Sequence, residues 1–177
     1  MMCKLLLVLA TFSVALSSLE ENWQTFVDPE GKFEVRFPDS VSTSSKTVST
    51  PIGDLNCYTL VSKERLGADE NVYQLRYCDY PAGMLHPDSS ALIEDFFEVT
   101  IAESVESVEG ELLYVDDLNR REPSKLWKVT SEKYGLHFKN RAILVGDRLY
   151  NFQVVTTPEN SLKSKSDEFF DSFKLKT

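Results

Sequence analysis

Histidine, glycine and closely spaced cysteines are scarce in this chain. Its 177 residues include 2 histidines, 7 glycines and 3 cysteines. Neither His86 nor His137 belongs to a G-x-S-x-G elbow, an H-E-x-x-H helix or a cysteine–histidine nucleophile pattern. The glycines are scattered singly, which excludes a glycine-rich phosphate-binding loop. We therefore expect no enzyme activity, no cofactor and no bound metal; a hydrolase that uses one of the two histidines is the alternative.

Long apolar runs are missing as well. The uncharged, mostly apolar run Leu5–Leu16 has 12 residues, whereas a membrane-spanning helix needs about 20. A lysine precedes this run, and Ala15 and Ser17 occupy the −3 and −1 positions of a small-residue cleavage site. The pattern predicts a secretory signal peptide over residues 1–17, with an uncleaved anchor as the alternative. We expect residues 18–177 to form one secreted or periplasmic domain without a stable membrane span.

The charges are unevenly distributed along the chain. The net charge of −9 argues against binding to a nucleic-acid backbone. Residues 64–117 hold 14 acidic and 2 basic side chains, whereas residues 118–148 hold 8 basic and 3 acidic ones. Either the two segments neutralise one another, or they form a polarised surface that binds a charged partner. For the second case, the candidate partner-binding basic face consists of Arg120, Arg121, Lys139 and Arg141.

The hydrophobic pattern predicts an α+β domain, in which an antiparallel β-sheet is flanked by helices. Asp88-Ser-Ser90 is expected to begin an amphipathic helix that ends near Glu106, and Asn160 to begin a C-terminal helix. The polar segment 38–46 is expected to be a loop. Gly146-Asp147 is typical of a type II′ hairpin turn. The predicted strands are 23–27, 32–37, 47–50, 56–62, 72–78, 111–115, 125–130, 136–145 and 148–156.

Cys57 and Cys78 lie in two neighbouring predicted strands. If these strands pair so that the cysteines face each other, Tyr58 faces Tyr77, and one face of the hairpin becomes apolar while the other is mixed. A one-residue slip would destroy that sorting. In an exported protein this register favours a Cys57–Cys78 disulfide. Two unpaired cysteines, or metal ligation together with a histidine, are the alternatives.

Three segments carry a resemblance to known proteins. They are Asp28-Pro-Glu-Gly-Lys-Phe-Glu-Val-Arg-Phe-Pro38, Leu144-Val-Gly-Asp-Arg-Leu-Tyr150 and Phe169-Phe-Asp-Ser-Phe-Lys-Leu175. The chain resembles a group of exported, mostly uncharacterised bacterial-type proteins, similar in architecture to the PsbP-like fold. The extrinsic oxygen-evolving subunit of photosystem II and a family of Ran-binding nuclear transport factors share that fold. The resemblance implies a PsbP-like α/β/α sandwich that acts by binding rather than by catalysis.

The function expected from these observations is therefore a binding one. We expect an exported binding or assembly module that recognises an unknown protein partner through a charged face or a sheet edge. The alternative is a small-ligand carrier with a pocket between helix and sheet. A carrier needs a large apolar pocket, whereas a partner-binding module needs an exposed patch.

Overall fold

Two antiparallel sheets and two helices make up the part of the chain that the computed structural model describes, which is residues 23–50, 53–85, 89–118 and 121–176. The expected signal peptide, His86 and Arg120 lie outside these ranges. The elements in chain order are β1 (Gln24–Asp28), β2 (Phe33–Phe37), β3 (Ser42–Thr50), β4 (Gly53–Leu66), β5 (Asp69–Asp79), α1 (Ser90–Ser107), β6 (Glu111–Asp117), β7 (Ser124–Ser131), β8 (Leu136–Val145), β9 (Arg148–Thr156), α2 (Ser166–Asp171) and β10 (Lys174–Leu175). None of the helices within the described ranges is both long enough and apolar enough to cross a membrane.

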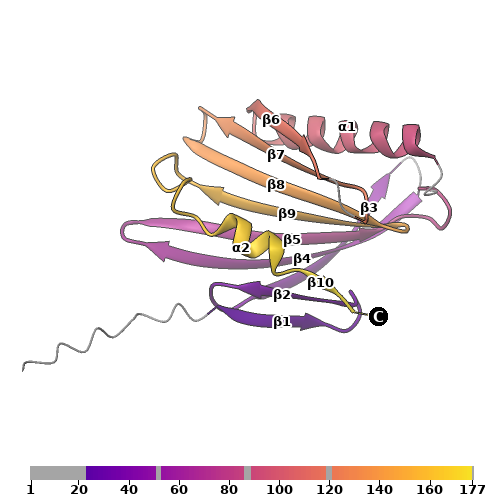
Figure 1. Cartoon of the computed structure of the whole chain (residues 1–177), viewed down its shortest axis with the longest axis horizontal. Helices are drawn as coiled ribbons and strands as arrows, with labels where there is room; N and C mark the ends of the chain where they lie inside the picture. Colours follow the sequence, from indigo (N-terminus) through magenta and orange to yellow (C-terminus); the bar gives the residue numbers. More distant parts are fainter. Residues whose placement is uncertain (1–22, 51–52, 86–88, 119–120, 177) are drawn as a thin grey trace, which may run out of the picture.

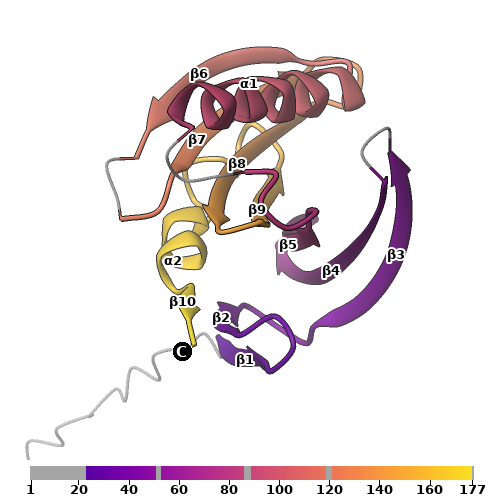
Figure 2. The same ribbon diagram turned by 90° about the vertical axis from the view of Figure 1, so that its right-hand side faces the viewer.

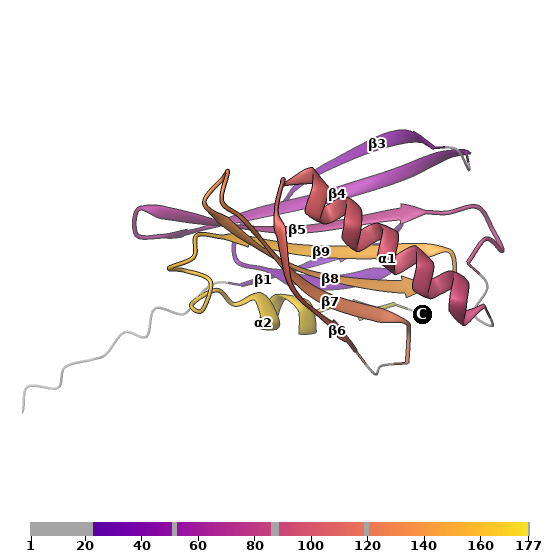
Figure 3. The ribbon, with the colours of Figure 1, turned by 90° about the horizontal axis from the view of Figure 1, so that it is seen from above.

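The larger sheet has seven strands in the order β3-β4-β5-β9-β8-β7-β6, and every neighbouring pair is antiparallel. It is strongly curved and bends toward the side on which α1 lies (Figures 1 and 2). α1 crosses obliquely over this face (Figure 3). A smaller sheet, β1-β2-β10, covers part of the opposite face together with α2.

Apolar side chains fill both interfaces of the large sheet. On the α1 side, Ile93, Phe97 and Ile101 of the helix pack in a cluster with Trp127 and Val129 of β7. The spacing of the three helix residues places them on one face of the helix. On the other side, aromatic residues of the small sheet and α2 pack in a second cluster. Its largest fully buried members are Phe33, Phe37, Tyr73, Tyr77, Phe152 and Phe169.

The predicted register of the cysteine hairpin is confirmed. Cys57 pairs with Cys78 and Tyr58 with Tyr77 across β4 and β5, and a disulfide joins the two cysteines. Both are buried, in a small cluster with Leu55. Such a bond is compatible with an exported protein, and it removes both thiolates as metal ligands.

The predicted sheet flanked by helices fits only in part, because the helices are minor elements. β-Strands dominate, and α2 has only 6 residues, so the layer opposite α1 is mainly the small sheet. The predicted bounds of β8 and β9 are confirmed. Between them the positive φ falls on Gly146 and not on Asp147, as a type II′ turn requires.

Two predicted elements are wrong. The segment 38–46, expected to be a loop, contains the first part of β3. Every residue from Ser42 to Ser49 is exposed, so the strand has no buried face that the sequence pattern could reveal. The C-terminal helix begins at Ser166 rather than at Asn160. Asn160 is buried, and its side-chain amide donates to Asp69 at 2.9 Å. This contact holds the segment in turns before the helix.

Candidate functional site

Strand β6 is an edge of the large sheet and exposes a row of apolar side chains. It pairs only with β7 among the described strands. The four consecutive residues Leu112, Leu113, Tyr114 and Val115 are 40%, 47%, 38% and 39% exposed. Its outer edge therefore presents unpaired backbone groups beside apolar surface, which is the arrangement that binds an added strand.

A β-bulge orients two of these residues in the same direction. The register between β6 and β7 shifts between Leu112 and Tyr114, so Leu113 is the extra residue. Leu112 pairs with Val129, and Val115 pairs with Trp127. Because the two β7 residues are two positions apart, they share a face, and so do their partners. Without the bulge, Leu112 and Val115 would lie on opposite faces of the strand.

These two side chains meet one flank of α1 and form a groove with it. The helix contributes Ile101, Ala102 and Val105, which lie on one stripe of its surface. The groove has a volume of about 590 Å³ and is open to solvent. We call this apolar hollow between α1 and the β6 edge of the large sheet the β6 groove.

Acidic side chains surround the β6 groove. Glu94, Glu98 and Glu106 of α1 line it, and Lys125 of β7 is the cation beside them. The Lys125 ammonium is buried, forms an ion pair with Asp117 at 2.7 Å, and also donates to Glu94. Burial lowers the pKa of Lys125, but the hydrogen bonds to Asp117 and Glu94 raise it more. The lysine is thus a neutralised structural cation, and the remaining rim is acidic.

The structure separates the residues of the predicted basic face. Lys139 and Arg141, both on β8, are directed to α2: Lys139 donates to Asp167 at 2.7 Å, and Arg141 donates to the carbonyl of Phe170 at 2.7 Å. The side chain of Arg141 is only 5% exposed. Arg121 is almost fully exposed, at 95%, and lines a different hollow. The partner-binding role of this set stays a prediction.

His137 lies on β8, where its side chain is half-buried. Its Nδ1 atom has no hydrogen-bond partner within the described ranges. Burial holds the pKa of His137 below its usual value, and Lys128 lowers it further. Across the same ranges, no three histidine, cysteine, aspartate or glutamate side chains are grouped as metal ligands.

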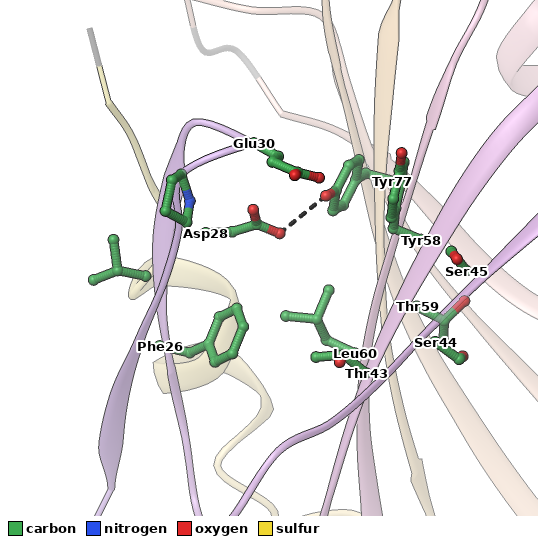
Figure 4. Close-up of a pocket in the computed structure, with 12 residues that line it drawn as sticks. Phe26, Asp28, Glu30, Thr43, Ser44, Ser45, Tyr58, Thr59, Leu60 and Tyr77 are labelled. Carbon is green, nitrogen blue, oxygen red and sulfur yellow. Dashed lines mark hydrogen bonds between the residues drawn. The ribbon is translucent and has the colours of Figure 1, made fainter.

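A second hollow lies between the β1–β2 hairpin and β4 (Figure 4). It has a volume of about 350 Å³, and the stacked rings of Tyr58 and Tyr77, with centroids 4.8 Å apart, line it. Asp28 accepts a hydrogen bond from the Tyr77 hydroxyl at 2.9 Å and another from the backbone N–H of Gly31 at 2.8 Å. Because the protein already satisfies these polar groups, the hollow offers a ligand less than the β6 groove does.

One sequence feature indicates the exposed strand of the β6 groove. Leu112-Leu113-Tyr114-Val115 is an apolar run without alternation, which is unusual for a strand with one wet face. No local pattern reveals that the bulge brings Leu112 and Val115 together, nor that α1 lies beside them.

Comparison with known proteins supports the fold. The sequence matches no protein-family model and no curated protein. The solution structure of cyanobacterial PsbP (CyanoP) from Synechocystis is similar to this chain, with a TM-score of 0.58 and 14% identity over 88% of this chain and 93% of that one. A crystal structure of a protein of unknown function from Pseudomonas aeruginosa, described as a putative regulator, gives a TM-score of 0.35 and 14% identity over 80% of this chain and 87% of that one. The first likeness supports a PsbP-like fold and bears on the fold alone.

Proposed function

We propose that this protein is an exported, non-catalytic binding or assembly module that binds an extended segment of a partner protein at the β6 groove. The observation that carries the proposal is the exposed apolar edge strand beside that groove. Soluble proteins usually protect such edges with charges on the strand, a covering loop or short strand length. Here the apolar residues at the middle of the strand stay exposed.

Strand addition accounts for the arrangement of the site. An added strand would form main-chain hydrogen bonds with the outer edge of β6, which supply affinity without regard to sequence. Every second side chain of the added strand would point to the α1 side of the sheet and lie next to Leu112 and Val115. Specificity would come from these side chains.

The charges around the groove select the chemistry of the partner. Its apolar floor favours Val, Ile, Leu or aromatic side chains. Glu98 and Glu106, the two rim glutamates that do not pair with Lys125, favour Lys or Arg. The cation already present, Lys125, is neutralised by its own ion pairs. The partner segment is therefore an extended one in which the side chains that face α1, at every second position, include both apolar and basic residues.

A carrier for an apolar small ligand is supported less well. The interface between α1 and β7 is filled by core side chains such as Phe97, Trp127 and Val129, each 2% exposed or less. The apolar hollow lies at the sheet edge and is open to solvent. An open strip beside an unpaired strand suits a peptide chain better than an enclosed lipid-like ligand.

The test uses two synthetic peptides of ten residues with threonine at every second position, so that the residues between them share one face. In one peptide these residues alternate between valine and lysine, and in the other between valine and glutamate. Isothermal titration calorimetry is performed at low and high salt. We expect the lysine peptide to bind, with an affinity that falls as salt rises, and the glutamate peptide not to bind. Equal binding of both peptides, or no binding of either, would overturn the proposal.

Variants locate the binding. The double variant Leu112→Lys/Val115→Lys places charges on the groove floor and should abolish binding of the lysine peptide. Val48→Lys is the matched control, because Val48 is an exposed apolar residue on β3, the opposite edge of the same sheet. Binding that survives in the double variant, or that is lost equally in the control, would contradict the assignment to β6.

A further inference from the structure

A polar stripe crosses the face of the large sheet that α1 covers. Cross-strand pairs place Gln74 of β5 beside Gln153 of β9, and Arg76 beside Asn151. Gln153 in turn pairs with Asn140 of β8 and donates to it at 2.9 Å. These positions belong to the middle strands, where the face beneath a helix is normally apolar. The apolar core under α1 stops at this stripe.

The stripe forms one wall of a chamber, and the flank of α1 that points away from β6 forms the other. Thr100, Glu103, Ser104 and Ser107 of the helix face Gln74, Arg76, Asn151 and Gln153 of the sheet. The chamber has a volume of about 300 Å³ and is more enclosed than the β6 groove. That volume suits a small ligand. The two sites lie on opposite flanks of α1.

The hydroxyl groups of α1 that line the chamber already donate hydrogen bonds within the protein. The hydroxyls of Thr100, Ser104 and Ser107 donate to carbonyls of their own helix at 2.9, 2.7 and 2.9 Å. Ser104 Oγ also accepts from the indole N–H of Trp127 at 2.7 Å. The oxygens of Thr100 and Ser107 keep lone pairs, so the wall offers acceptors rather than donors.

Other polar side chains of the chamber have no hydrogen-bond partner from the protein within the described ranges, and two of them, Arg76 and Glu103, are exposed to solvent. Asn151 Oδ1 is buried and accepts no hydrogen bond, which costs about 1–3 kcal/mol in a folded protein. Arg76 and Glu103 both line the chamber and form no ion pair with each other. Burial raises the pKa of Tyr80, while Arg76 lowers it and Glu103 raises it. Because Arg76 and Glu103 both affect the Tyr80 hydroxyl, the two charged side chains lie near one another.

We infer that this chamber binds a small zwitterion, such as a free α-amino acid. The Arg76 guanidinium would bind the carboxylate, because an arginine presents paired N–H donors that match it. Asn151 Oδ1, Glu103 and the hydroxyl oxygens of α1 would accept from the ammonium group. A ligand of this class satisfies the one free cation and the acceptors of the chamber together, whereas a simple anion would leave the acceptors unmet.

The first experiment measures thermal unfolding of the full chain with each common α-amino acid at about 10 mM, since a ligand that binds the folded state raises Tm. The amino acid with the largest effect is then titrated by calorimetry, beside its methyl ester and its N-acetyl derivative. The free amino acid should bind, and both derivatives should bind at least about tenfold more weakly, because each lacks one charge. A derivative that binds as well as the parent, or no rise in Tm with any amino acid, would overturn the inference.

Two variants separate binding from folding. Arg76→Gln should weaken binding at least about tenfold, whereas Arg65→Gln, a matched change at an exposed arginine of β4, should not. Asn151→Leu removes the unpartnered buried oxygen and should weaken binding without lowering the stability of the free protein. Unchanged affinity in Arg76→Gln would contradict the inference. Peptide binding at the β6 groove should persist in all three variants, so that the two sites are tested independently.

Discussion

Removing the Cys57–Cys78 disulfide should lower the free energy of unfolding by about 3 kcal/mol. The bond closes a loop with a sequence separation of 21 residues, and the entropy that such a cross-link removes from the unfolded chain corresponds to about 3 kcal/mol at 25 °C. The double variant Cys57→Ala/Cys78→Ala keeps small side chains at both buried positions. The paired strands on either side should hold the register, so the native structure should persist.

The assay is urea unfolding followed by tryptophan fluorescence, with thermal unfolding as a second measure. Tm should fall by about 6–12 °C for a domain of this size. The parent protein under reductant should match the double variant, whereas reductant should leave the stability of the double variant unchanged. A loss below about 1 kcal/mol would refute the loop-entropy reasoning.

Three further outcomes follow from contacts in the structure. Ser104→Ala leaves the buried indole N–H of Trp127 without its acceptor, so urea unfolding should show a loss of about 1–3 kcal/mol. Arg141→Ala should cost about 1.5–3 kcal/mol by the same measurement, since its guanidinium bonds to α2, whereas Arg121→Ala should stay within about 0.5 kcal/mol. Burial favours the neutral form of His137, so its contribution to stability is present above a pH of about 6.5 and is lost as the pH falls below it. The pH dependence of unfolding in this range should therefore be flatter in His137→Gln.

Local signals were enough to predict most of the strands. Gly146 has the conformational freedom that a two-residue hairpin needs, and this fixed the bounds of β8 and β9. The cysteine register followed because only one pairing sorts apolar from polar side chains. β3 could not be predicted in full, since a strand exposed on both faces has no alternation of apolar and polar residues. The start of α2 depends on Asn160 and Asp69, which are far apart in sequence.

The candidate sites could be predicted far less well than the fold. The sequence shows an acidic segment and a basic segment, but it does not show that Lys125 of the basic segment is paired with Glu94 and Asp117 of the acidic one. Lys133 with Glu109 and Arg148 with Asp79 are further ion pairs between the same two segments. Both the β6 groove and the chamber depend on where α1 lies over the sheet, and no local pattern specifies that placement.

The measurement that tests the central proposal most directly is amide hydrogen exchange at both edges of the large sheet. Exchange is followed by NMR with and without the valine–lysine peptide. Strand addition gives the outward N–H groups of β6 new acceptors, so exchange within Leu112–Asp116 should slow while exchange in β3 stays unchanged. Unchanged exchange in β6 when the peptide is bound, or protection of β3 instead, would contradict a partner-binding site at the β6 groove.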